Sequence, residues 1–273
     1  MSLTIITVAY NSHLAISSNL KSLIDSNRFP VVIVDNGSEP ESVEAVKKEF
    51  SNVNLLEMGQ NAGYGRAANA GLSVCDTEYV LLINPDINID VEMVVKLMQR
   101  AKEHKGESPL VAPAVTTDAQ TFDGAKERRW ISGSIMLIDV EAVREIGLFD
   151  ENIFLYFEDS DLCQRVIDSG QKILQFTDFL VLHQKGQSCI INSDAQRMKS
   201  WHYGWSWSYF KDKHERRGFY MKALRRALIY WIKSVTRLDP MKRLEYGCQA
   251  RGVLAYLLGR KAFGEQGRPE LLP

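Results

Sequence analysis

Short β-branched apolar runs alternate with longer amphipathic stretches through the first half of the chain. The apolar runs predict buried strands and the amphipathic stretches predict helices, which together are typical of a parallel or mixed sheet with covering helices. We expect strands at residues 3–9, 31–34, 53–58 and 79–83, and helices at residues 13–26, 40–50, 65–75 and 91–105.

The rest of the chain is less regular and changes character near residue 200. We expect strands at residues 131–139, 173–175 and 179–183, with a helix at 159–169 between them. From Trp201 onward the sequence is aromatic, basic and helical, with helices expected at 221–235 and 244–263. We therefore predict an α/β domain over residues 1–196 and a helical region over 197–273.

Charge is divided unevenly between these two parts, although the whole chain has a formal net charge of -1. Residues 1–196 hold 16 basic and 28 acidic side chains, and residues 197–273 hold 17 basic and 6 acidic side chains. The formal net charge is thus about -12 for residues 1–196 and about +11 for residues 197–273. This pattern fits a catalytic body with a basic region that faces an anionic partner, and it also fits a basic tail docked on the acidic body.

Composition excludes several classes of protein. With 45% hydrophobic and 25% charged residues the 273-residue chain is neither disordered, collagenous nor a coiled coil. Its four cysteines are far apart and indicate neither a zinc site nor a disulfide framework, which fits a reducing cytosol. The first residues lack the features of a signal peptide, and we expect no membrane-spanning segment.

Polar residues follow each of the first four predicted strands. They are Tyr10-Asn11, Asp35-Asn36-Gly37, Asn61-Ala62-Gly63 and Asp86. Open α/β sheets bind their ligands at the carboxyl ends of the strands, so these residues are candidates for one binding site.

Two of these positions have more than one interpretation. Asp35 fits a carboxylate that accepts hydrogen bonds from a base or ribose, and equally an Asx turn with the residues after it. Asp86 fits a ligand for a divalent ion that carries a diphosphate, or a helix N-cap. The segment from Gly63 to Ala68 has the GxGxxA form of a dinucleotide site, but two strands precede it, which disfavours NAD binding.

The densest acidic cluster, Glu158-Asp159-Ser160-Asp161, follows an aromatic run that ends at Phe157. Carboxylates beside aromatic surface lose solvation and repel one another, which favours a raised pKa suited to accepting a proton. The same residues also fit a helix N-terminus whose dipole favours acids. His183 ends a predicted strand among apolar neighbours.

These motifs together resemble the family 2 inverting nucleotide-sugar glycosyltransferases, and most closely the rhamnosyltransferase-like branch that builds bacterial surface polysaccharides. The resemblance covers roughly residues 3–190. It rests on six segments: VAYN at 8–11, VIVDNGS at 32–38, NAGYGRAANAG at 61–71, NPD at 84–86, SGS at 132–134 and FDENIFLYFEDSDLCQR at 149–165.

The resemblance implies a GT-A fold, a Rossmann-like mixed sheet with covering helices, and a donor site at the strand ends. Asp35 would hold the pyrimidine base, and the loop with Arg66 would lie under the diphosphate and sugar. The implied donor-binding residues are Ala9, Tyr10, Asn11, Asp35, Asn36, Gly37, Asn61, Gly63, Gly65, Arg66, Asn69, Asn84, Pro85 and Asp86.

The same resemblance implies a metal-assisted single displacement. Asp159 would be the base that takes the acceptor proton, and Asp86 with His183 would bind Mg²⁺ or Mn²⁺. Asn84 stands where the family's metal motif usually begins with Asp, so one charge is missing there. The implied sugar or acceptor pocket comprises Trp130, Ser132, Gly133, Glu158 and Asp161.

Apolar residues of the basic region recur at helical spacing from Met221 to Val235, with Lys222, Arg225, Arg226 and Lys233 among them. This pattern favours a peripheral helix on an anionic membrane, where a lipid-linked acceptor would be found. Packing against the rest of the chain or in a homodimer also fits, whereas no nucleic-acid-binding motif is present. We expect a bacterial cytoplasmic enzyme on the inner face of the membrane.

Three functions thus remain open from the sequence. A glycosyltransferase is favoured, with dTDP-L-rhamnose as the donor and UDP-hexoses or UDP-galactofuranose as alternatives. The acceptor would be a lipid-linked or growing cell-surface glycan. The others are a catalytically inactive nucleotide-binding scaffold and a dinucleotide oxidoreductase.

Overall fold

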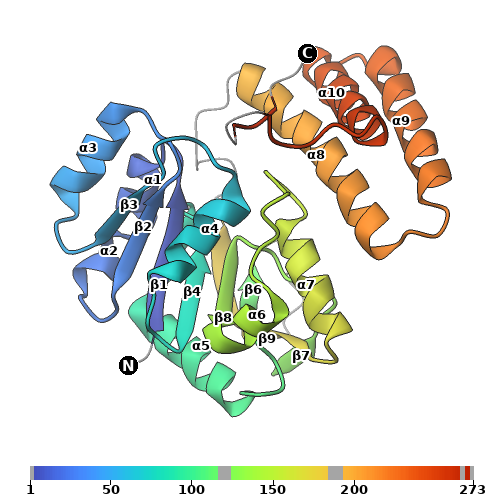
Figure 1. Cartoon of the computed structure of the whole chain (residues 1–273). Helices are drawn as coiled ribbons and strands as arrows, with labels where there is room; N and C mark the ends of the chain where they lie inside the picture. The colour runs from blue at the N-terminus through green and yellow to red at the C-terminus, as the bar shows by residue number, and fades with distance from the viewer. Residues whose placement is uncertain (1–2, 116–123, 184–192, 265–267, 271–273) are drawn as a thin grey trace. The chain divides into compact units, whose positions relative to one another are not determined.

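The computed structural model describes residues 3–115, 124–183, 193–264 and 268–270 of the chain. These residues form two compact units (Figure 1). The first unit comprises Met1–Phe149 and Leu162–Ile190, and the second comprises Asp150–Asp161 and Ile191–Pro273. The division differs from the predicted one at residue 196, because residues 150–161 cluster with the C-terminal helices.

The first unit is built on one mixed sheet. Its strands are β1 (Leu3–Ala9), β2 (Val31–Asp35), β3 (Asn54–Glu57), β4 (Tyr79–Ile83), β5 (Ile87–Asn88), β6 (Leu110–Val115), β7 (Ala125–Glu127), β8 (Ile135–Asp139) and β9 (Ile173–His183). The strand order is β3-β2-β1-β4-β8-β6-β9-β5, and β7 also pairs with β9. The four strands β3, β2, β1 and β4 run parallel, so their carboxyl ends share one edge.

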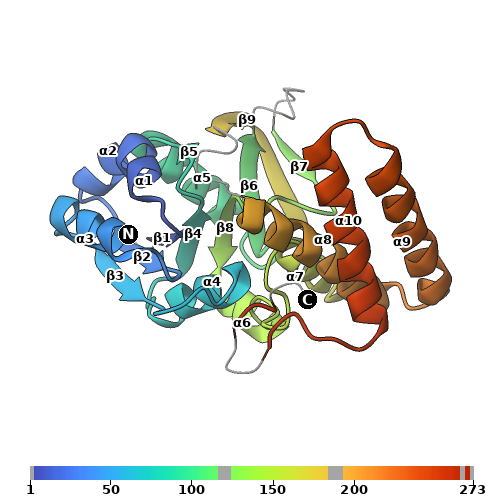
Figure 2. The ribbon, with the colours of Figure 1, turned by 90° about the horizontal axis from the view of Figure 1, so that it is seen from above.

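Helices cover both faces of this sheet (Figure 2). The helices are α1 (His13–Asn19), α2 (Lys21–Asp25), α3 (Pro40–Glu49), α4 (Tyr64–Ser73), α5 (Val91–Glu103), α6 (Val140–Ile146) and α7 (Glu158–Asp168), of which α7 begins in the second unit. Alternate residues of a strand point to opposite faces. Accordingly Ile5 and Ile33 pack in the core with α1, α2, α3 and α5, whereas Ile6 and Val32 pack in the core with α4, α6 and α7.

Several element boundaries differ from the predicted ones. The expected helix at 13–26 is two helices that meet at Leu20, and the expected strand at 131–139 begins only at Ile135. The expected strands at 173–175 and 179–183 are one strand, β9, whose pairing with β6 shifts register between Pro113 and Ala114. Strands β5, β6 and β7 were not predicted.

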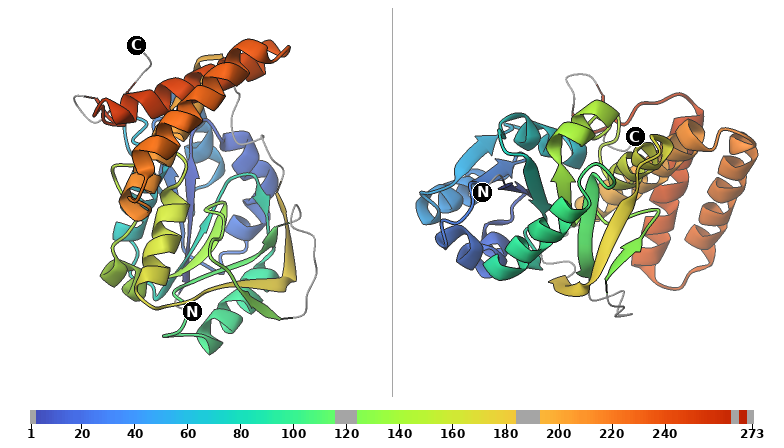
Figure 3. Two further views of the ribbon diagram at one scale, coloured as in Figure 1. Left: turned by 90° about the vertical axis from the view of Figure 1, so that its right-hand side faces the viewer. Right: turned by 90° about the horizontal axis from the view of Figure 1, so that it is seen from below.

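The second unit contains three helices, α8 (Ser193–His214), α9 (Phe219–Thr236) and α10 (Pro240–Leu257). Helices α9 and α10 form an antiparallel hairpin (Figures 2 and 3). Helices α8 and α10 cross with their backbones in close approach, because a Cβ on Gly252 would stand 2.0 Å from the carbonyl oxygen of Trp201. The helix predicted at 244–263 is α10, which begins four residues earlier, at Pro240, and ends at Leu257.

The aromatic run of α8 supplies the core of the second unit. Trp201 and Trp205 pack with Phe154, while Trp207 packs with Phe219 and Tyr230 of α9. These buried rings explain why residues 150–161 belong structurally to the C-terminal helices: Phe154 is 2% exposed and is enclosed by the side chains of that unit.

Candidate active site

The parallel pairing of β1 with β2 brings the first two polar strand ends together. Ala9 lies opposite Asp35, and the amide of Asn36 donates to the carbonyl oxygen of Ala9 at 2.8 Å. Asp35 is buried, and its Oδ2 accepts hydrogen bonds from the amides of Gly37 and Ser38, both at 3.2 Å. The Asx turn is therefore present, and within the described part of the chain only Oδ2 of this carboxylate accepts a hydrogen bond.

The loop after β2 is joined to the loop after β3 by two side-chain amides. Asn36 donates from Nδ2 to Oδ1 of Asn61 at 3.1 Å, and its own Oδ1 accepts from the amide of Ala62 at 2.9 Å. Oδ1 of Asn61 also accepts from the amide of Gly63 at 3.1 Å. Asn36 and Asn61 thus fix the shape of the glycine loop that precedes α4.

Gly37 makes this close approach possible. Its φ of +80° lies in the left-handed region, and a Cβ there would stand 2.4 Å from the carbonyl carbon of Gln60. No real Cβ contact is this short, so a side chain at position 37 would push the two loops apart.

The loop after β1 closes over the same edge. Asn11 has a left-handed φ of +51°, its amide donates to Oγ of Ser38 at 2.8 Å, and its Oδ1 accepts from the amide of Glu39 at 2.8 Å. Tyr10, in the same loop, is 37% exposed. A non-glycine residue in this region of φ costs about 1–3 kcal/mol, which surrounding contacts must offset.

The glycine loop opens α4 after β3, the edge strand of the parallel part. A dinucleotide site would instead follow β1. Gly63 is the N-cap residue with φ +87°, Gly65 is buried and Arg66 is half-buried in the first turn. Asn69 is engaged elsewhere, because its side-chain amide both donates to and accepts from the backbone of Phe149, at 2.9 and 3.0 Å.

Tyr64, which the sequence analysis did not select, connects three of the expected site segments. Its hydroxyl donates to the carbonyl oxygen of Gly133 at 2.8 Å and lies 3.2 Å from Oδ1 of Asn84. The amide of Asn84 donates to the carbonyl oxygen of Ser134 at 2.8 Å. The only sequence signal for Tyr64 was its place between two glycines of the loop.

The SGS segment forms a tight turn ahead of β8. Oγ of Ser132 accepts from the amide of Ser134 at 3.2 Å, and Gly133 is buried. Trp130, just before this turn, is 50% exposed, whereas its neighbour Ile131 is buried. A half-exposed indole beside a site offers a flat apolar face for stacking.

Asp86 lies in the turn just before β5, and β5 pairs with the end of β9 at His183. Asp86 is 2% exposed, and Asn19 donates from Nδ2 to the carbonyl oxygen of Pro85 at 3.2 Å. The next residue, Ile87, pairs antiparallel with His183. The side chain of His183 lies outside the described part of the chain, and among the described side chains no cluster of three potential metal ligands occurs.

The chemistry of Asp86 nevertheless fits a hard cation. A carboxylate oxygen is the ligand type that Mg²⁺ and Mn²⁺ prefer, and burial of such a group favours a cationic partner. The backbone pairing places the α-carbon of His183 opposite that of Ile87, the residue that follows Asp86.

The acidic cluster belongs to the second unit and follows a strained segment. Tyr156 and Phe157 have φ values of +66° and +69°, and Glu158 then begins α7. Ring contacts with Tyr203 of α8 hold both, with centroid distances of 5.5 and 5.4 Å. Two successive left-handed aromatic residues are costly, and such strain is concentrated at functional sites.

Glu158 and Asp159 have different surroundings. Glu158 is 8% exposed, and burial, together with the neighbouring charge of Asp159, raises its pKa from 4.5 to about 8. Asp159 is partly exposed, and its Oδ1 accepts hydrogen bonds from the amide and the hydroxyl of Ser160. The structure thus shows the expected raised pKa at Glu158, while Asp159 is the carboxylate of the pair that solvent reaches.

Asp161 and Asp150 tie this segment to the end of α8. Asp161 is fully buried, with its Oδ1 2.7 Å from Nζ of Lys213 and 2.8 Å from Nε2 of His214. Asp150 accepts from Tyr209 and Lys213 at 2.8 and 2.6 Å. Burial alone would raise the pKa of Asp150, but the bonds from Lys213, Asn152 and Tyr209 lower it to about 2.

Comparison with known proteins identifies the family of the chain that forms this site. The family model for glycosyl transferase family 2 matches residues 4–162, more than half of the 273-residue chain. This chain is a family 2 glycosyltransferase. The match runs from β1 into α7, so it includes the polar strand ends of the first unit and the acidic start of α7.

Two curated relatives extend over most of this glycosyltransferase. One is the N-acetylglucosaminyl-diphospho-decaprenol L-rhamnosyltransferase of Mycobacterium tuberculosis, 24% identical over 263 residues, covering 78% of this chain and 85% of the relative. The other is the amylovoran biosynthesis glycosyltransferase AmsE of Erwinia amylovora, 23% identical, covering 84% of this chain and 91% of the relative.

Solved structures confirm the expected GT-A fold. A crystal structure of GalNAc-T7 with UDP, GalNAc and Mn²⁺ superposes with a TM-score of 0.61 at 12% identity, over 94% of this chain and 56% of the other. At this identity the likeness concerns the fold alone. Along the described residues of this glycosyltransferase, every helix is too short or too polar to cross a bilayer.

Proposed function

We propose that this glycosyltransferase moves L-rhamnose from dTDP-L-rhamnose to a hydroxyl group of a lipid-linked or growing cell-surface glycan. The observation that carries the proposal is the family match over the strand ends that gather Asp35, Asn36 and Asn61 at one edge. The rhamnosyl donor is supported by the mycobacterial rhamnosyltransferase, which aligns with 78% of this chain. A UDP-hexose or UDP-galactofuranose is the alternative donor.

In this proposal the donor lies along the carboxyl edge of β1, β2 and β4. The carboxylate of Asp35 accepts a hydrogen bond from the pyrimidine base, with Ala9, Tyr10 and Asn11 beside the nucleoside. The loop of Asn61, Gly63, Gly65 and Arg66 faces the diphosphate, since backbone amides at a helix N-terminus and a guanidinium both favour anions. The proposed site does not include Asn69, whose amide is engaged by Phe149.

Asp86 and His183 would hold a divalent cation in this enzyme. When bound, Mg²⁺ or Mn²⁺ would offset the charge of the departing nucleoside diphosphate. Asn84, in place of an aspartate, contributes a neutral amide that Tyr64 approaches at 3.2 Å. We therefore expect the cation to bind more weakly in the absence of the donor than with the diphosphate present.

The proposed chemistry is a single displacement. Asp159 takes the proton of the acceptor hydroxyl, whose oxygen forms a bond to the anomeric carbon of the donor sugar. The bond from that carbon to the diphosphate oxygen breaks at the same time, its electron pair leaves with the nucleotide, and the anomeric configuration inverts. Glu158, protonated at neutral pH because its pKa is about 8, adds no second negative charge beside Asp159.

The exposed face of α9 supports membrane association. Its apolar residues are all solvent-exposed, by 44–74%: Met221, Leu224, Leu228, Trp231, Ile232 and Val235. Lys222 and Arg225 lie on the same helix and are exposed, whereas Arg226 turns inward and stacks on Trp207 at 4.2 Å. We propose that this face binds the anionic inner surface of the bacterial membrane; burial in a homodimer is the competing outcome.

A donor panel tests the proposed function. The full chain is titrated with dTDP-L-rhamnose, UDP-GlcNAc, UDP-galactose, UDP-galactofuranose and NAD, with and without Mn²⁺, while Tm is recorded. We expect the largest rise in Tm with dTDP-L-rhamnose and Mn²⁺. Asp86→Asn should lose the Mn²⁺ effect, and Asp76→Asn, an exposed position before β4, should keep it. A larger rise in Tm with a UDP-sugar would identify that sugar nucleotide as the donor in place of dTDP-L-rhamnose. A rise in Tm with NAD alone would overturn the proposal.

A further inference from the structure

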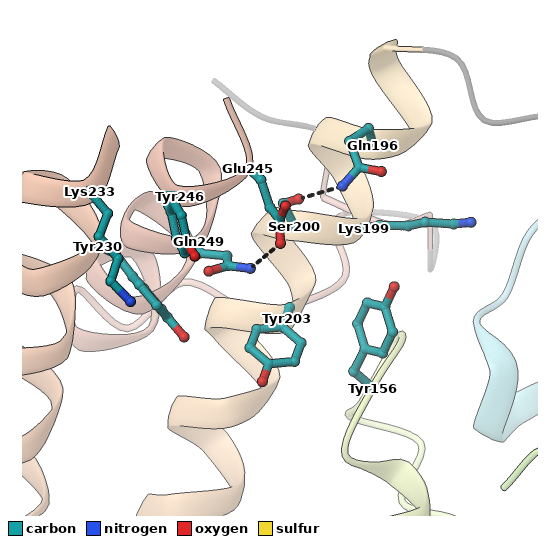
Figure 4. A pocket seen from close by; sticks show the side chains of 10 residues that line it. All are labelled: Tyr156, Gln196, Lys199, Ser200, Tyr203, Tyr230, Lys233, Glu245, Tyr246 and Gln249. Carbon is teal, nitrogen blue, oxygen red and sulfur yellow. Dashed lines mark hydrogen bonds between the residues drawn. The ribbon is translucent and has the colours of Figure 1, made fainter. Parts of the chain in front are cut away.

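The second unit contains a cavity that the donor site and the base do not use. Its volume is about 470 Å³, within the range of roughly 300–1,000 Å³ that small-molecule sites occupy. Helices α8, α9 and α10 line it together with the strained residue before α7 (Figure 4). The lining residues are Tyr156, Gln196, Lys199, Ser200, Tyr203, Tyr230, Lys233, Glu245, Tyr246 and Gln249.

The lining has the chemistry of a saccharide site. None of these ten side chains is aliphatic, and four are tyrosines. Tyr230 and Tyr246 stack with their ring centroids 5.8 Å apart, and Figure 4 shows Tyr203 between that pair and Tyr156. Aromatic faces pack on the apolar side of a sugar ring, and phenol, amide and carboxylate groups bond to its hydroxyls.

The polar groups of the cavity are held in place. Gln249, 7% exposed, donates from Nε2 to Oε1 of Glu245 at 3.3 Å, and Gln196 donates to Oγ of Ser200 at 3.2 Å. Arg226 donates from Nε to the hydroxyl of Tyr230 at 2.9 Å, which fixes that ring from behind. Such fixed partners reduce the ordering cost of binding.

Lys233 gives the cavity a place for an anion. Its Nζ lies 5.0 Å from the ring centroid of Tyr246, whereas the amino group of Lys199 points away from that ring in Figure 4. The one carboxylate of the lining, Glu245, is already paired by Lys242 at 2.7 Å. An ammonium group is a compact charge well suited to a phosphate.

The cavity is also connected to the reacting segment through the chain. Tyr156 lines it and stands three residues before Asp159, within the same unit. On the other side, Tyr230 and Lys233 come from α9, the helix whose opposite surface exposes the apolar face. A ligand in the cavity therefore touches both the segment that carries the base and the helix proposed to meet the membrane.

From these observations we propose that the cavity is an acceptor subsite for a glycosyl phosphate, a pyranose ring that carries a phosphate group. The tyrosines and amides take the ring, and Lys233 takes the phosphate. This inference rests on the proposed function, because it assigns the acceptor of that reaction a place in the second unit.

Ligand binding to the full chain tests the subsite. The probes are N-acetylglucosamine 1-phosphate, glucose 1-phosphate, the two phosphate-free sugars and inorganic phosphate, with dissociation constants measured by ligand-observed NMR. We expect a hexose 1-phosphate to bind at least tenfold more tightly than its free sugar and than inorganic phosphate. Lys233→Gln and Tyr203→Ala should each weaken it at least tenfold, while Lys261→Gln, an exposed lysine of the same unit, should not.

The donor provides the second readout. Nucleotide-sugar affinity and Tm are measured on the same proteins, and both should be unchanged in Lys233→Gln if only the acceptor subsite is affected. Equal binding of a hexose 1-phosphate by the wild type and both cavity variants would overturn the subsite, as would equal binding of inorganic phosphate. A wild type that binds no nucleotide sugar would instead overturn the proposed function, whatever the hexose phosphates do.

Discussion

The phenol of Tyr64 donates a hydrogen bond to the carbonyl oxygen of Gly133, with 2.8 Å between the two oxygens. The two residues are 69 positions apart in sequence. Their bond joins the start of α4 to the turn before β8, and Asn84 lies against the same hydroxyl at 3.2 Å. One side chain therefore contacts three of the expected site segments.

Tyr64→Phe should loosen that spacing. Removing the hydroxyl leaves the carbonyl of Gly133 without this donor, at a cost of about 1 kcal/mol in the free energy of unfolding. We expect a several-fold rise in the dissociation constant for the donor as well, measured by calorimetry. The matched control is Tyr220→Phe, since that tyrosine is 67% exposed on α9. Equal donor affinity in the two variants would show that the Tyr64 hydroxyl has no part in the site.

Gly37→Ala should separate the loops after β2 and β3. The substituted residue would carry both the cost of a left-handed φ and a 2.4 Å contact with the backbone of Gln60. Gly59→Ala is the control, because Gly59 has φ +71° with open space around its Cβ position. We expect about 1–2 kcal/mol of destabilisation for Gly59→Ala and clearly more for Gly37→Ala, from denaturant unfolding. Equal losses of stability in the two variants would show that the close approach to Gln60 does not add to the cost at position 37.

The sequence predicted the parallel half of the sheet well, because three of its four strands, β1, β2 and β4, are buried and mostly apolar runs with polar residues after them. Residues 79–83 and 3–9 were assigned with the observed bounds. Strand β6 was missed because Pro113 interrupts a short run, and β9 was divided because its bulge places polar residues in mid-strand. Such strands depend on partners distant in sequence, which a local pattern does not contain.

The candidate site shows the same limit. The polar strand ends were visible because they follow strands, and the strands' parallel pairing does bring Asp35 beside Ala9. The engagement of Asn69 by Phe149 and of Asp161 by His214 could not be predicted, because each bond joins residues more than 50 positions apart. The loop partner Tyr64 was overlooked for the same reason.

Asp159→Asn should abolish proton transfer without disturbing the donor. A positioned general base contributes about 10²–10⁴-fold, so kcat should fall by that factor with little change in donor affinity. Asp168→Asn, in the last turn of the same helix, should keep its kcat. An Asp159→Asn enzyme with wild-type turnover would exclude this residue as the base. Turnover is measured by release of the nucleoside diphosphate.

Glu158 should make the protein less stable as the pH rises. Its pKa is about 8 in the fold against 4.5 ordinarily, so between these values the folded state retains a proton that the unfolded state releases. The stabilising contribution is complete below pH 4.5 and is lost by about pH 8, at up to about 1.4 kcal/mol per pH unit.

Glu158→Gln removes this titration and provides the test. Urea unfolding at pH 5, 6, 7 and 8 should show stability falling with pH in the wild type and a smaller fall in the variant. His202, fully buried with both ring nitrogens unbonded within the described part of the chain, acts in the opposite direction. Burial lowers its pKa to about 3, so its contribution is lost as the pH falls below 6.5. Parallel curves for wild type and Glu158→Gln would refute the assignment.

The α9 face should bind anionic vesicles. Each fully buried apolar side chain contributes about 1.5–3 kcal/mol and each nearby basic residue about 1 kcal/mol. The double substitution Leu228→Ser with Trp231→Ser should therefore reduce sedimentation with phosphatidylglycerol vesicles at least tenfold. Leu14→Ser, at a leucine of α1 that is 77% exposed, should not reduce it. If the wild type stays in the supernatant at low salt and dimerises through this face, the α9 face is a homodimer interface and not a membrane-binding surface.

The bonds from Asp161 to Lys213 and His214 also bear on the order in which the protein can be made. Residues 150–161 leave the ribosome some fifty residues before the end of α8, and their partners, the buried Trp201 and Trp205 and the more exposed Lys213, follow later. The nascent chain can complete the parallel strands while the segment that carries Asp159 still lacks its supports. A chain that ends after residue 190 would thus keep the strands of the proposed donor site, but the segment that carries Asp159 would lack its packing and bonding partners on α8.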